Sequence, residues 1–387
     1  PRGLINTGNM CFINTILQTL AYCPPFTDLL ETLGQRLKAD LGRKTPLLES
    51  VIVFLRELQP SGSALPLNDA FVPENVYDAM KENKRFDSMR RGFQEDAEEY
   101  LGFFLNTLHE ELLYLLSRTH TRSTAQANGT PSSEGREHSI ERPLSPSAQA
   151  DSGGASAWLE VGKKQRTHVV RSNEARESAI TRIFGGTLRS ILHIPGAKDS
   201  VTLEPYQPLQ LDISDPASTM SVVDALRHLS TPETVQTWSA AKKENVDATK
   251  TVFVETWPAV LICHLKRFVY DAEEREVVKK SRAVAYGTEL IVPNEIISPT
   301  KRSSVPVKYR LFGVVYHHGS TAGGGHYTVA VSRQDHQQWI HFDDETVQPV
   351  PTDQVVVSPE EAESGRAGLI GGREKCAYLL FYQRVRA

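Results

Sequence analysis

The amino-acid sequence predicts an α+β fold, with helices in the first third of the chain and strands in most of the remainder. Apolar residues recur at helical spacing up to about residue 116. From about residue 188, short apolar runs are separated by Gly, Pro and Asn, which is typical of strands joined by turns. Helices followed by strands favour an α+β fold over an alternating α/β fold. The 387 residues, 40 % of them apolar, are enough for one large domain.

The composition argues against several classes of protein. A net charge of −4 gives no basic excess of the kind that nucleic-acid binders carry, so no nucleic-acid partner is expected. No apolar run reaches the length of a membrane span, and residues 1–4 do not begin a signal peptide, so no membrane partner is expected either. Because the chain lacks an initiator Met, we expect it to be a piece of a longer protein.

Cysteines are scarce and unpaired in the sequence. There are four, namely Cys11, Cys23, Cys263 and Cys376, and none forms a C-x-x-C pair. This pattern predicts neither a zinc ribbon nor a disulfide framework. It suits a reducing compartment, so we expect the cytoplasm, with the nucleus as a second location.

The first helix is expected to start near Met10, with Cys11 in its first turn. Its apolar residues follow at helical spacing: Ile13, Ile16, Leu17 and Leu20. Pro24 is expected to end it. At a helix start, unpaired backbone N–H groups and the positive end of the dipole stabilise a thiolate. From position alone, a plain buried cysteine remains the commoner interpretation.

Further elements follow from the same patterns. Helices are predicted at 47–58, 76–82, 94–116 and 222–229. The polar segment 117–166 is expected to be a disordered insertion, within which the apolar island 158–161 could dock elsewhere on the protein. Strands are predicted at 188–193, 209–213, 251–255, 259–265, 309–316, 326–331, 339–342 and 377–382. Residues 358–375 are expected to form a loop.

A cysteine nucleophile needs a base, and His326 is the candidate. Three glycines precede it, and it opens a predicted strand. The strand at 339–342 ends at Asp343 and Asp344, and it could pair antiparallel with the His326 strand, so that Asp343 would hold the imidazole ring. Taken singly, a hairpin histidine and a turn aspartate remain ordinary alternatives.

Three further positions complete the candidates around Cys11. Asn6 could donate its amide to an oxyanion, a contribution of about 3 kcal/mol in comparable sites, although a plain turn asparagine is the alternative. His317 and His318 are expected at the other end of the His326 hairpin and are given no role. His341 is expected to be structural or solvent-facing.

Several of these segments resemble the ubiquitin-specific protease family. Residues 3–18 (GLINTGNMCFINTILQ) are similar to its cysteine box, and 324–327 with 339–344 are similar to its histidine box. Residues 94–100 resemble its glutamine motif, and 264–268 and 377–382 match as well. The segments most similar to the ubiquitin carboxyl-terminal hydrolase 10 subgroup are 184–186, 309–312 and 315–319. The matches cover nearly the whole chain in the family's order.

The resemblance implies one papain-like catalytic domain over residues 1–387. Its parts would be a helical thumb at 1–116, β fingers at about 180–257 and a β palm at 258–387. By motif position, Cys11 would be the nucleophile, His326 the base, Asp343 its orienting acid and Asn6 the oxyanion donor. Asp344 would be an accessory polar residue. Gly324, Gly325 and Tyr327 would line the channel for the C-terminal Gly-Gly of ubiquitin.

The implied activity is that of a deubiquitinating thiol protease, which hydrolyses the peptide or isopeptide bond after the last glycine of ubiquitin. The expected partners are ubiquitin and ubiquitinated proteins, together with an NTF2-like cofactor protein that would bind sequence outside this chain. The main alternative is a ubiquitin-binding pseudoenzyme, but Cys, His and the acid are all present. A transglutaminase-like acyltransferase is a further alternative, which the glutamine and histidine motifs do not support.

The chain departs from the family at one point. Many members hold a zinc ion in the fingers with two C-x-x-C pairs, whereas the corresponding segments here, 188–193 and 238–242, contain no cysteine. A lone His193 cannot make a four-ligand site. We therefore predict no structural zinc, no other metal and no cofactor.

Overall fold

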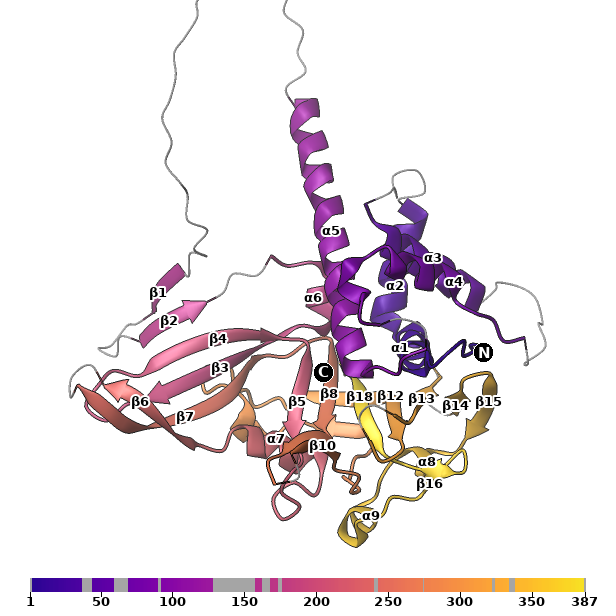
Figure 1. Cartoon of the computed structure of the whole chain (residues 1–387). Coiled ribbons are helices and arrows are strands. Elements are labelled where there is room, and N and C mark those ends of the chain that lie inside the picture. The colour runs from indigo at the N-terminus through magenta and orange to yellow at the C-terminus, as the bar shows by residue number, and fades with distance from the viewer. Residues whose placement is uncertain are drawn as a thin grey trace, which may run out of the picture.

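In the computed structural model, the described residues are 2–36, 44–58, 69–89, 92–127, 157–161, 168–172, 176–239, 243–273, 275–321, 324–333 and 338–385. Helices dominate the first part of the chain and strands the rest, so the predicted α+β class is confirmed. Figure 1 shows a helical thumb, a central palm sheet and a fingers sheet that projects to one side. No described helix is long and apolar enough to cross a membrane.

In the part of the thumb that the structure describes, there are five α-helices and one short 3₁₀ helix. They are α1 Cys11–Ala21, α2 Pro24–Arg36, α3 Pro46–Leu58, α4 Glu74–Lys81, η1 Lys84–Phe86 and α5 Ala97–Ala127. The predicted start of the first helix is confirmed. The first helix ends at Ala21, just before Pro24 as predicted, and Pro24 itself opens α2, because proline fits the first turn of a helix, where its missing N–H has no partner to lose.

The helix α5 corrects the predicted disordered insertion at 117–166. It runs eleven residues into that segment, to Ala127, because extending a helix that has already nucleated costs little. The remainder of the insertion, at 128–156 and 162–167, lies outside the described residues.

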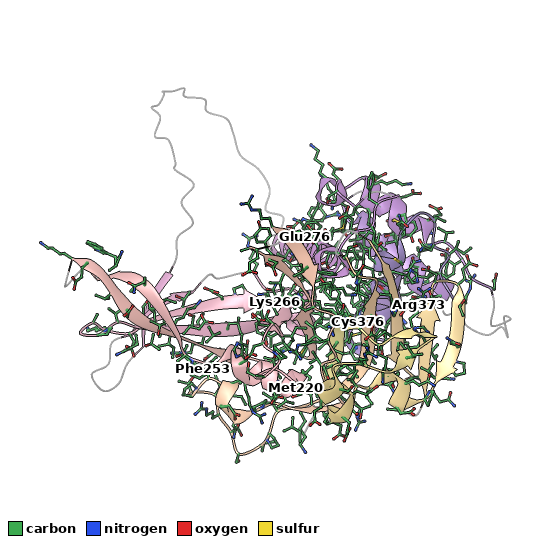
Figure 2. All side chains as sticks on the ribbon, turned by 60° about the horizontal axis from the view of Figure 1, so that its bottom comes forward. Met220, Phe253, Lys266, Glu276, Arg373 and Cys376 are labelled. Atoms are coloured by element: carbon green, nitrogen blue, oxygen red, sulfur yellow. The ribbon has the colours of Figure 1, made fainter. Side chains whose placement is uncertain are left out.

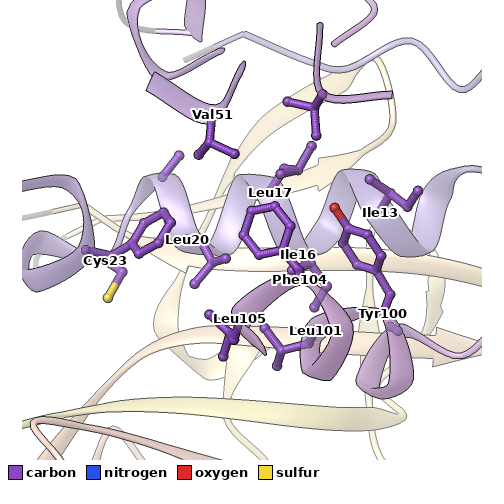
Figure 3. Close-up of a cluster of buried hydrophobic side chains, with 14 of the residues drawn as sticks. Ile13, Ile16, Leu17, Leu20, Cys23, Val51, Tyr100, Leu101, Phe104 and Leu105 are labelled. Atoms are coloured by element: carbon purple, nitrogen blue, oxygen red, sulfur yellow. The ribbon is translucent and has the colours of Figure 1, made fainter. Parts of the chain in front are cut away.

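The helix α1 lies at the centre of the thumb and is buried along its whole length. Figure 3 shows Ile13, Ile16, Leu17 and Leu20 of α1 packed against α5. The facing residues of α5 are Tyr100, Leu101, Phe104 and Leu105. The same core cluster includes Tyr327, Val329 and Phe342 of the palm. The helix that begins with Cys11 is therefore held between the thumb and the palm sheet.

The fingers form a six-stranded sheet in the order β1-β2-β4-β3-β7-β6. Its strands are β1 Ala157–Val161, β2 His168–Ser172, β3 Gly186–His193, β4 Ser200–Tyr206, β6 Glu233–Ser239 and β7 Glu244–Thr256. The apolar island at 158–161 forms most of β1, which pairs with β2, and β2 runs parallel to β4. The expectation that it docks is therefore confirmed, and this part of the predicted insertion is not disordered.

The palm sheet has eight strands, in the order β15-β14-β13-β12-β18-β8-β5, with β11 beside β12. They are β5 Pro208–Asp212, β8 Val260–Lys266, β11 Glu289–Ile291, β12 Lys308–His318, β13 His326–Ser332, β14 Trp339–Asp343, β15 Thr346–Val350 and β18 Ala377–Arg384. The helix α7 Val222–Leu229 has its predicted bounds and packs in the palm core. The predicted fingers range 180–257 thus includes β5 and α7, which belong to the palm.

Smaller elements complete the fold. A short helix, α6 Ala179–Phe184, precedes the fingers, and a hairpin of β9 Phe268–Asp271 and β10 Glu276–Lys279 follows β8. The others are η2 Asn294–Ile296, α8 Thr352–Val355, α9 Pro359–Ser364, β16 Leu369–Ile370 and β17 Arg373–Glu374. The loop predicted at 358–375 is therefore wrong, since Ser358 and Glu361 form a capping box for α9, and β16 pairs with β17.

Candidate active site

Cys11 is the first residue of α1, and the preceding loop determines where it lies. Gly8 and Asn9 have positive φ values of 82° and 60°, a conformation that glycine and asparagine tolerate best. The Asn6 side-chain oxygen accepts the Met10 N–H at 2.8 Å. These turns direct the chain into the helix so that the thiol, which is 2 % exposed, faces the palm.

His326 and Asp343 come together because their strands pair antiparallel, as the sequence predicts. His326 Nε2 lies 2.5 Å from Asp343 Oδ1, and both side chains are about four-fifths buried, with 20 % and 23 % exposed. The Cys11 thiol lies close enough to His326 to raise the pKa of the imidazole. The three predicted residues are therefore in one continuous chain of contacts.

The groups around His326 favour the charged form of its imidazole. Burial alone would lower the pKa of His326, but its hydrogen bond to Asp343 and its interactions with Cys11 and Asp344 raise it to about 10. The hydrogen bond to His326 outweighs burial for Asp343 and lowers the pKa of that carboxyl group. A cationic imidazole held by a carboxylate is the partner that a thiolate nucleophile requires.

Asp344 connects the palm to the thumb. Its carboxylate accepts hydrogen bonds from the amides of Asn6 at 3.0 Å and Asn14 at 3.4 Å, and His326 Nε2 lies 3.8 Å away. Burial raises the pKa of this carboxyl group, in contrast to that of Asp343. The Tyr77 hydroxyl donates to Asn14 at 2.8 Å and continues the network into the thumb.

The amide of Asn6 is already engaged in this arrangement. One N–H binds Asp344, which leaves the second N–H of the amide group as the one that could serve an oxyanion. Sequence reasoning missed Asn14 as a site residue. The sequence could have indicated Asn14 by its position one helical turn after Cys11, because residues at that spacing lie on the same side of a helix.

The bend of the backbone before His326 gives a steric reason for glycine at these positions, in addition to the predicted channel. Gly325 has a φ of 146°, and a Cβ there would clash with the carbonyl oxygen of His318. A Cβ on Gly324 would lie 3.2 Å from Thr321 Oγ1. The bend therefore requires glycine at 325 whether or not a substrate passes beside it.

Tyr327 does not fit its predicted place along a channel. Its side chain is 1 % exposed, its ring lies 4.7 Å from that of His317, and its hydroxyl accepts the Ala97 N–H at 3.4 Å. The residue after His326 points to the opposite face of the sheet, which is the thumb core. Tyr327 therefore cannot line a substrate channel in this structure.

His317 and His318 lie beside the site, not at the far end of the hairpin. The strand register places His318 opposite His326 and His317 opposite Tyr327. The His318 and His326 rings stack at 6.4 Å, and burial lowers the pKa of His318 to about 3. His341 is fully buried, which agrees with the structural alternative predicted for it.

Metal-ligating side chains gather only at this site within the described residues. His326, Asp343 and Asp344 are the one group of three whose ligand atoms lie within 4.8 Å of one another. In the fingers, His193 Nδ1 lies 2.7 Å from Asp199 Oδ1. The absence of a structural zinc stays a prediction.

Comparison with known proteins gives a consistent result. The sequence model of one family, described as ubiquitin carboxyl-terminal hydrolase, matches residues 2–382. The probable ubiquitin carboxyl-terminal hydrolase 3 of Schizosaccharomyces pombe is 42 % identical over 385 residues, which are 99 % of this chain and 74 % of that protein. Ubiquitin carboxyl-terminal hydrolase 10 of Rattus norvegicus is 37 % identical over 407 residues, and this chain spans 48 % of its length.

Solved structures show the same fold. The Ubp8/Sgf11/Sus1/Sgf73 deubiquitinating module of SAGA bound to ubiquitin aldehyde contains a chain that matches with a TM-score of 0.69 and 20 % identity, over 100 % of this chain and 70 % of that one. The structure of the Ubp8-Sgf11-Sgf73-Sus1 deubiquitinating module of SAGA matches with a TM-score of 0.64 and 20 % identity, over 100 % of this chain and 68 % of that one. These likenesses confirm the predicted papain-like α+β fold.

Proposed function

The chain belongs to the ubiquitin carboxyl-terminal hydrolase family of cysteine-type deubiquitinases, and from this premise we propose that Cys11, His326 and Asp343 form its catalytic triad. The proposed reaction is hydrolysis of the peptide or isopeptide bond after the C-terminal glycine of ubiquitin. One observation carries the proposal: His326 is bound to the Asp343 carboxylate and lies close enough to the Cys11 thiol for the two groups to interact.

The contacts support a two-step acyl transfer. The Cys11 thiolate attacks the carbonyl carbon of the terminal glycine of ubiquitin, and the C–N bond breaks as His326 gives its proton to the leaving amine. This leaves a thioester between ubiquitin and Cys11. His326 then takes a proton from water, the hydroxide attacks the thioester, and Cys11 departs as the thiolate. Asp343 keeps the imidazole oriented through both steps.

Two groups are proposed to stabilise the oxyanion. The N–H groups of Cys11 and Phe12 begin α1, where a helix has no backbone acceptor for them, and the second N–H of Asn6 lies in the adjoining loop. Asp344 holds the Asn6 amide from the palm side, so its role is to fix the donor. Removing one such donor typically costs about 10²- to 10³-fold in kcat.

The substrate is proposed to enter between the thumb and the palm, past Gly324 and Gly325. A Gly-Gly terminus has no side chains, so a narrow passage excludes larger residues by steric clash. The body of ubiquitin would be held by the thumb at 1–116, the palm at 258–387 and the fingers, which lie between these two parts in the sequence. We also propose a cytoplasmic enzyme, with the nucleus as a second location, because the four cysteines are free thiols. The chain spans about half the length of the vertebrate relatives, and an NTF2-like partner would bind outside it.

Ubiquitin with a C-terminal electrophile tests the assignment. The chain should be labelled once, at Cys11, and Cys11→Ser should abolish labelling. Cys23→Ala is the matched control, since Cys23 is a buried thiol at the end of α1 away from the triad, and it should label at the rate of the unchanged chain. Labelling that survives Cys11→Ser would reject the triad. Binding of ubiquitin without labelling or turnover would favour the pseudoenzyme alternative.

A further inference from the structure

The segment 358–375 is firmly anchored to the palm. Lys375 is 3 % exposed, lies 2.9 Å from Glu361 Oε1 and donates to the carbonyl oxygens of Val356 at 2.7 Å and Asp353 at 3.2 Å. Glu361 Oε1 also accepts the Gly368 N–H at 2.6 Å. A buried lysine is tolerated only when it is paired in this way. The chain on both sides of the β16–β17 hairpin therefore has a fixed position.

The hairpin itself is seated against the catalytic strand β14. Gly371 and Gly372 have φ values of 56° and 79°, which is the conformation of a two-residue hairpin turn. A Cβ on Gly371 would lie 2.5 Å from His341 Cε1, so the turn rests directly on a side chain of β14. Ile370 is fully buried and fixes the other strand of the hairpin.

Arg373 follows this turn and contacts the acid of the triad. Its Nε lies 3.4 Å from Asp343 Oδ2, while Asp343 Oδ1 is bound to His326. Figure 2 marks Arg373 on the palm, on the side of the molecule away from Phe253 in the fingers. His318 and His341, which lie behind the triad, are neutral, because burial lowers their pKa values to about 3 and 4. Among the described residues, Arg373 and His326 are the cations paired with Asp343.

We propose that Arg373 is a positioning residue for the reaction: by holding Oδ2 of Asp343, it keeps Oδ1 directed at His326. This inference rests on the proposed triad. The alternative is an ordinary surface ion pair, since the Arg373 side chain is 46 % exposed and pairs of that kind often contribute nothing measurable. The anchored hairpin distinguishes the two, because it limits the conformations that the arginine backbone can adopt.

The test compares Arg373→Gln, Arg373→Lys and Arg366→Gln in steady-state hydrolysis of a ubiquitin C-terminal amide with a fluorescent leaving group. Arg373→Gln should lower kcat about fivefold with KM unchanged, and Arg373→Lys should restore part of the loss. Arg366→Gln removes the same charge from an exposed position of the same segment, and its kcat should not change. An equal loss in Arg366→Gln, or an unchanged kcat in Arg373→Gln, would overturn the proposal.

A double-mutant cycle asks whether Arg373 acts through Asp343. The rate of labelling by the ubiquitin electrophile is the readout, since it stays measurable when turnover is slow. Arg373→Gln should slow labelling of the unchanged chain about fivefold but have no further effect on Asp343→Ala. Full additivity would reject the proposal. Failure of the triad itself would appear differently, as labelling that does not require Cys11.

Discussion

The palm sheet and the fingers sheet are stabilised to different degrees. Palm strands are buried on both faces: β8 is buried from Val260 to Leu265, and β13 from Tyr327 to Ser332. In the fingers, β3 is half-buried along most of its length, and few described side chains there are fully buried, such as Val201 and Val254. Figure 1 shows the fingers projecting to one side of the body.

This difference follows what each region has to do. Catalysis requires three side chains held within a fraction of an ångström, and His326 and Asp343 belong to β13 and β14, whose other residues enter both core clusters. Gripping a protein substrate requires exposed area, and strands with little buried apolar surface form the low-stability part of a structure.

The largest effect is expected from His326→Ala. It should lower kcat at least about 10³-fold, because the variant loses both the proton acceptor and the proton donor. The dissociation constant for ubiquitin should change little, since the fingers remain intact. His193→Ala, at an exposed position of the fingers, is the control and should retain kcat. If ubiquitin binding falls as far as the rate, His326 is a structural residue.

Core truncations compare the two sheets directly. Leu380→Ala in β18 removes a fully buried side chain and should lower the free energy of unfolding by about 2–5 kcal/mol. Ile191→Ala in β3 removes a half-buried side chain and should cost about 1 kcal/mol. Urea unfolding monitored by circular dichroism measures both. Equal costs would show that the fingers are as tightly packed as the palm.

The third effect is a loss of palm stability in acid. Burial, as the main cause, lowers the pKa values of four palm histidines, to about 4 for His264 and His341 and about 3 for His317 and His318. Above pH 6.5 they are neutral in both states. Below it, the unfolded chain binds protons that the folded chain does not, so their contribution is lost as the pH falls toward 3.

Of the carboxyl groups whose pKa is raised, Glu98 and Glu111 of the thumb oppose this loss most. Burial raises the pKa values of Glu98 and Glu111 to about 7, so they favour the folded state increasingly as the pH falls from 7 to 4.5. Four histidines outweigh two carboxyl groups, and the free energy of unfolding should fall by about 1–3 kcal/mol per pH unit below 6.5. Urea midpoints at pH 7.5, 6.5 and 5.5 measure it. A midpoint that rises toward pH 5.5 would contradict the neutral, buried state of these histidines.

A smaller effect is expected from Trp238→Ser in the fingers. The side chain is 61 % exposed, so stability should change by less than about 0.5 kcal/mol, while KM for a ubiquitin substrate should rise a few-fold if this aromatic surface is covered on binding. Ile291→Ser, which is 54 % exposed on the palm strand β11, is the matched control and should leave KM unchanged. Equal KM values in the two variants would show that ubiquitin does not contact the Trp238 side chain.

The smallest effect is expected from a metal chelator. Because the fingers segments lack cysteine, EDTA should change neither the unfolding midpoint nor the affinity for ubiquitin. Stoichiometric zinc in the purified protein would contradict this.

The sequence predicted best what local patterns specify. The strands at 259–265 and 377–382 were identifiable because buried palm strands are continuous apolar runs, and Cys11, His326 and Asp343 lie in contiguous motifs. The strand β6 was not predicted, since its exposed, polar residues give no apolar alternation. The place of His318 beside His326 depends on strand register, which follows from the loop between them and not from either segment alone.

The position of the segment containing Arg373 could not be predicted from the sequence either. Its strands are two residues long, too short for any periodicity, and they are held in place by Lys375 and Glu361, whose ion pair only the folded chain forms. The buried side chain of Tyr327 is a similar case. Its neighbour His326 is at the site, but the alternation of a strand turns Tyr327 into the thumb core.

The packing of α1 between the thumb helices and the palm has a consequence for a chain cut in two. A peptide bond broken between residues 127 and 157 would leave Cys11 on one fragment and His326 on the other. The two fragments would still share one apolar core, which contains both Phe104 and Phe342. Hydrolysis by such a split enzyme would then rise with fragment concentration and report on their reassembly.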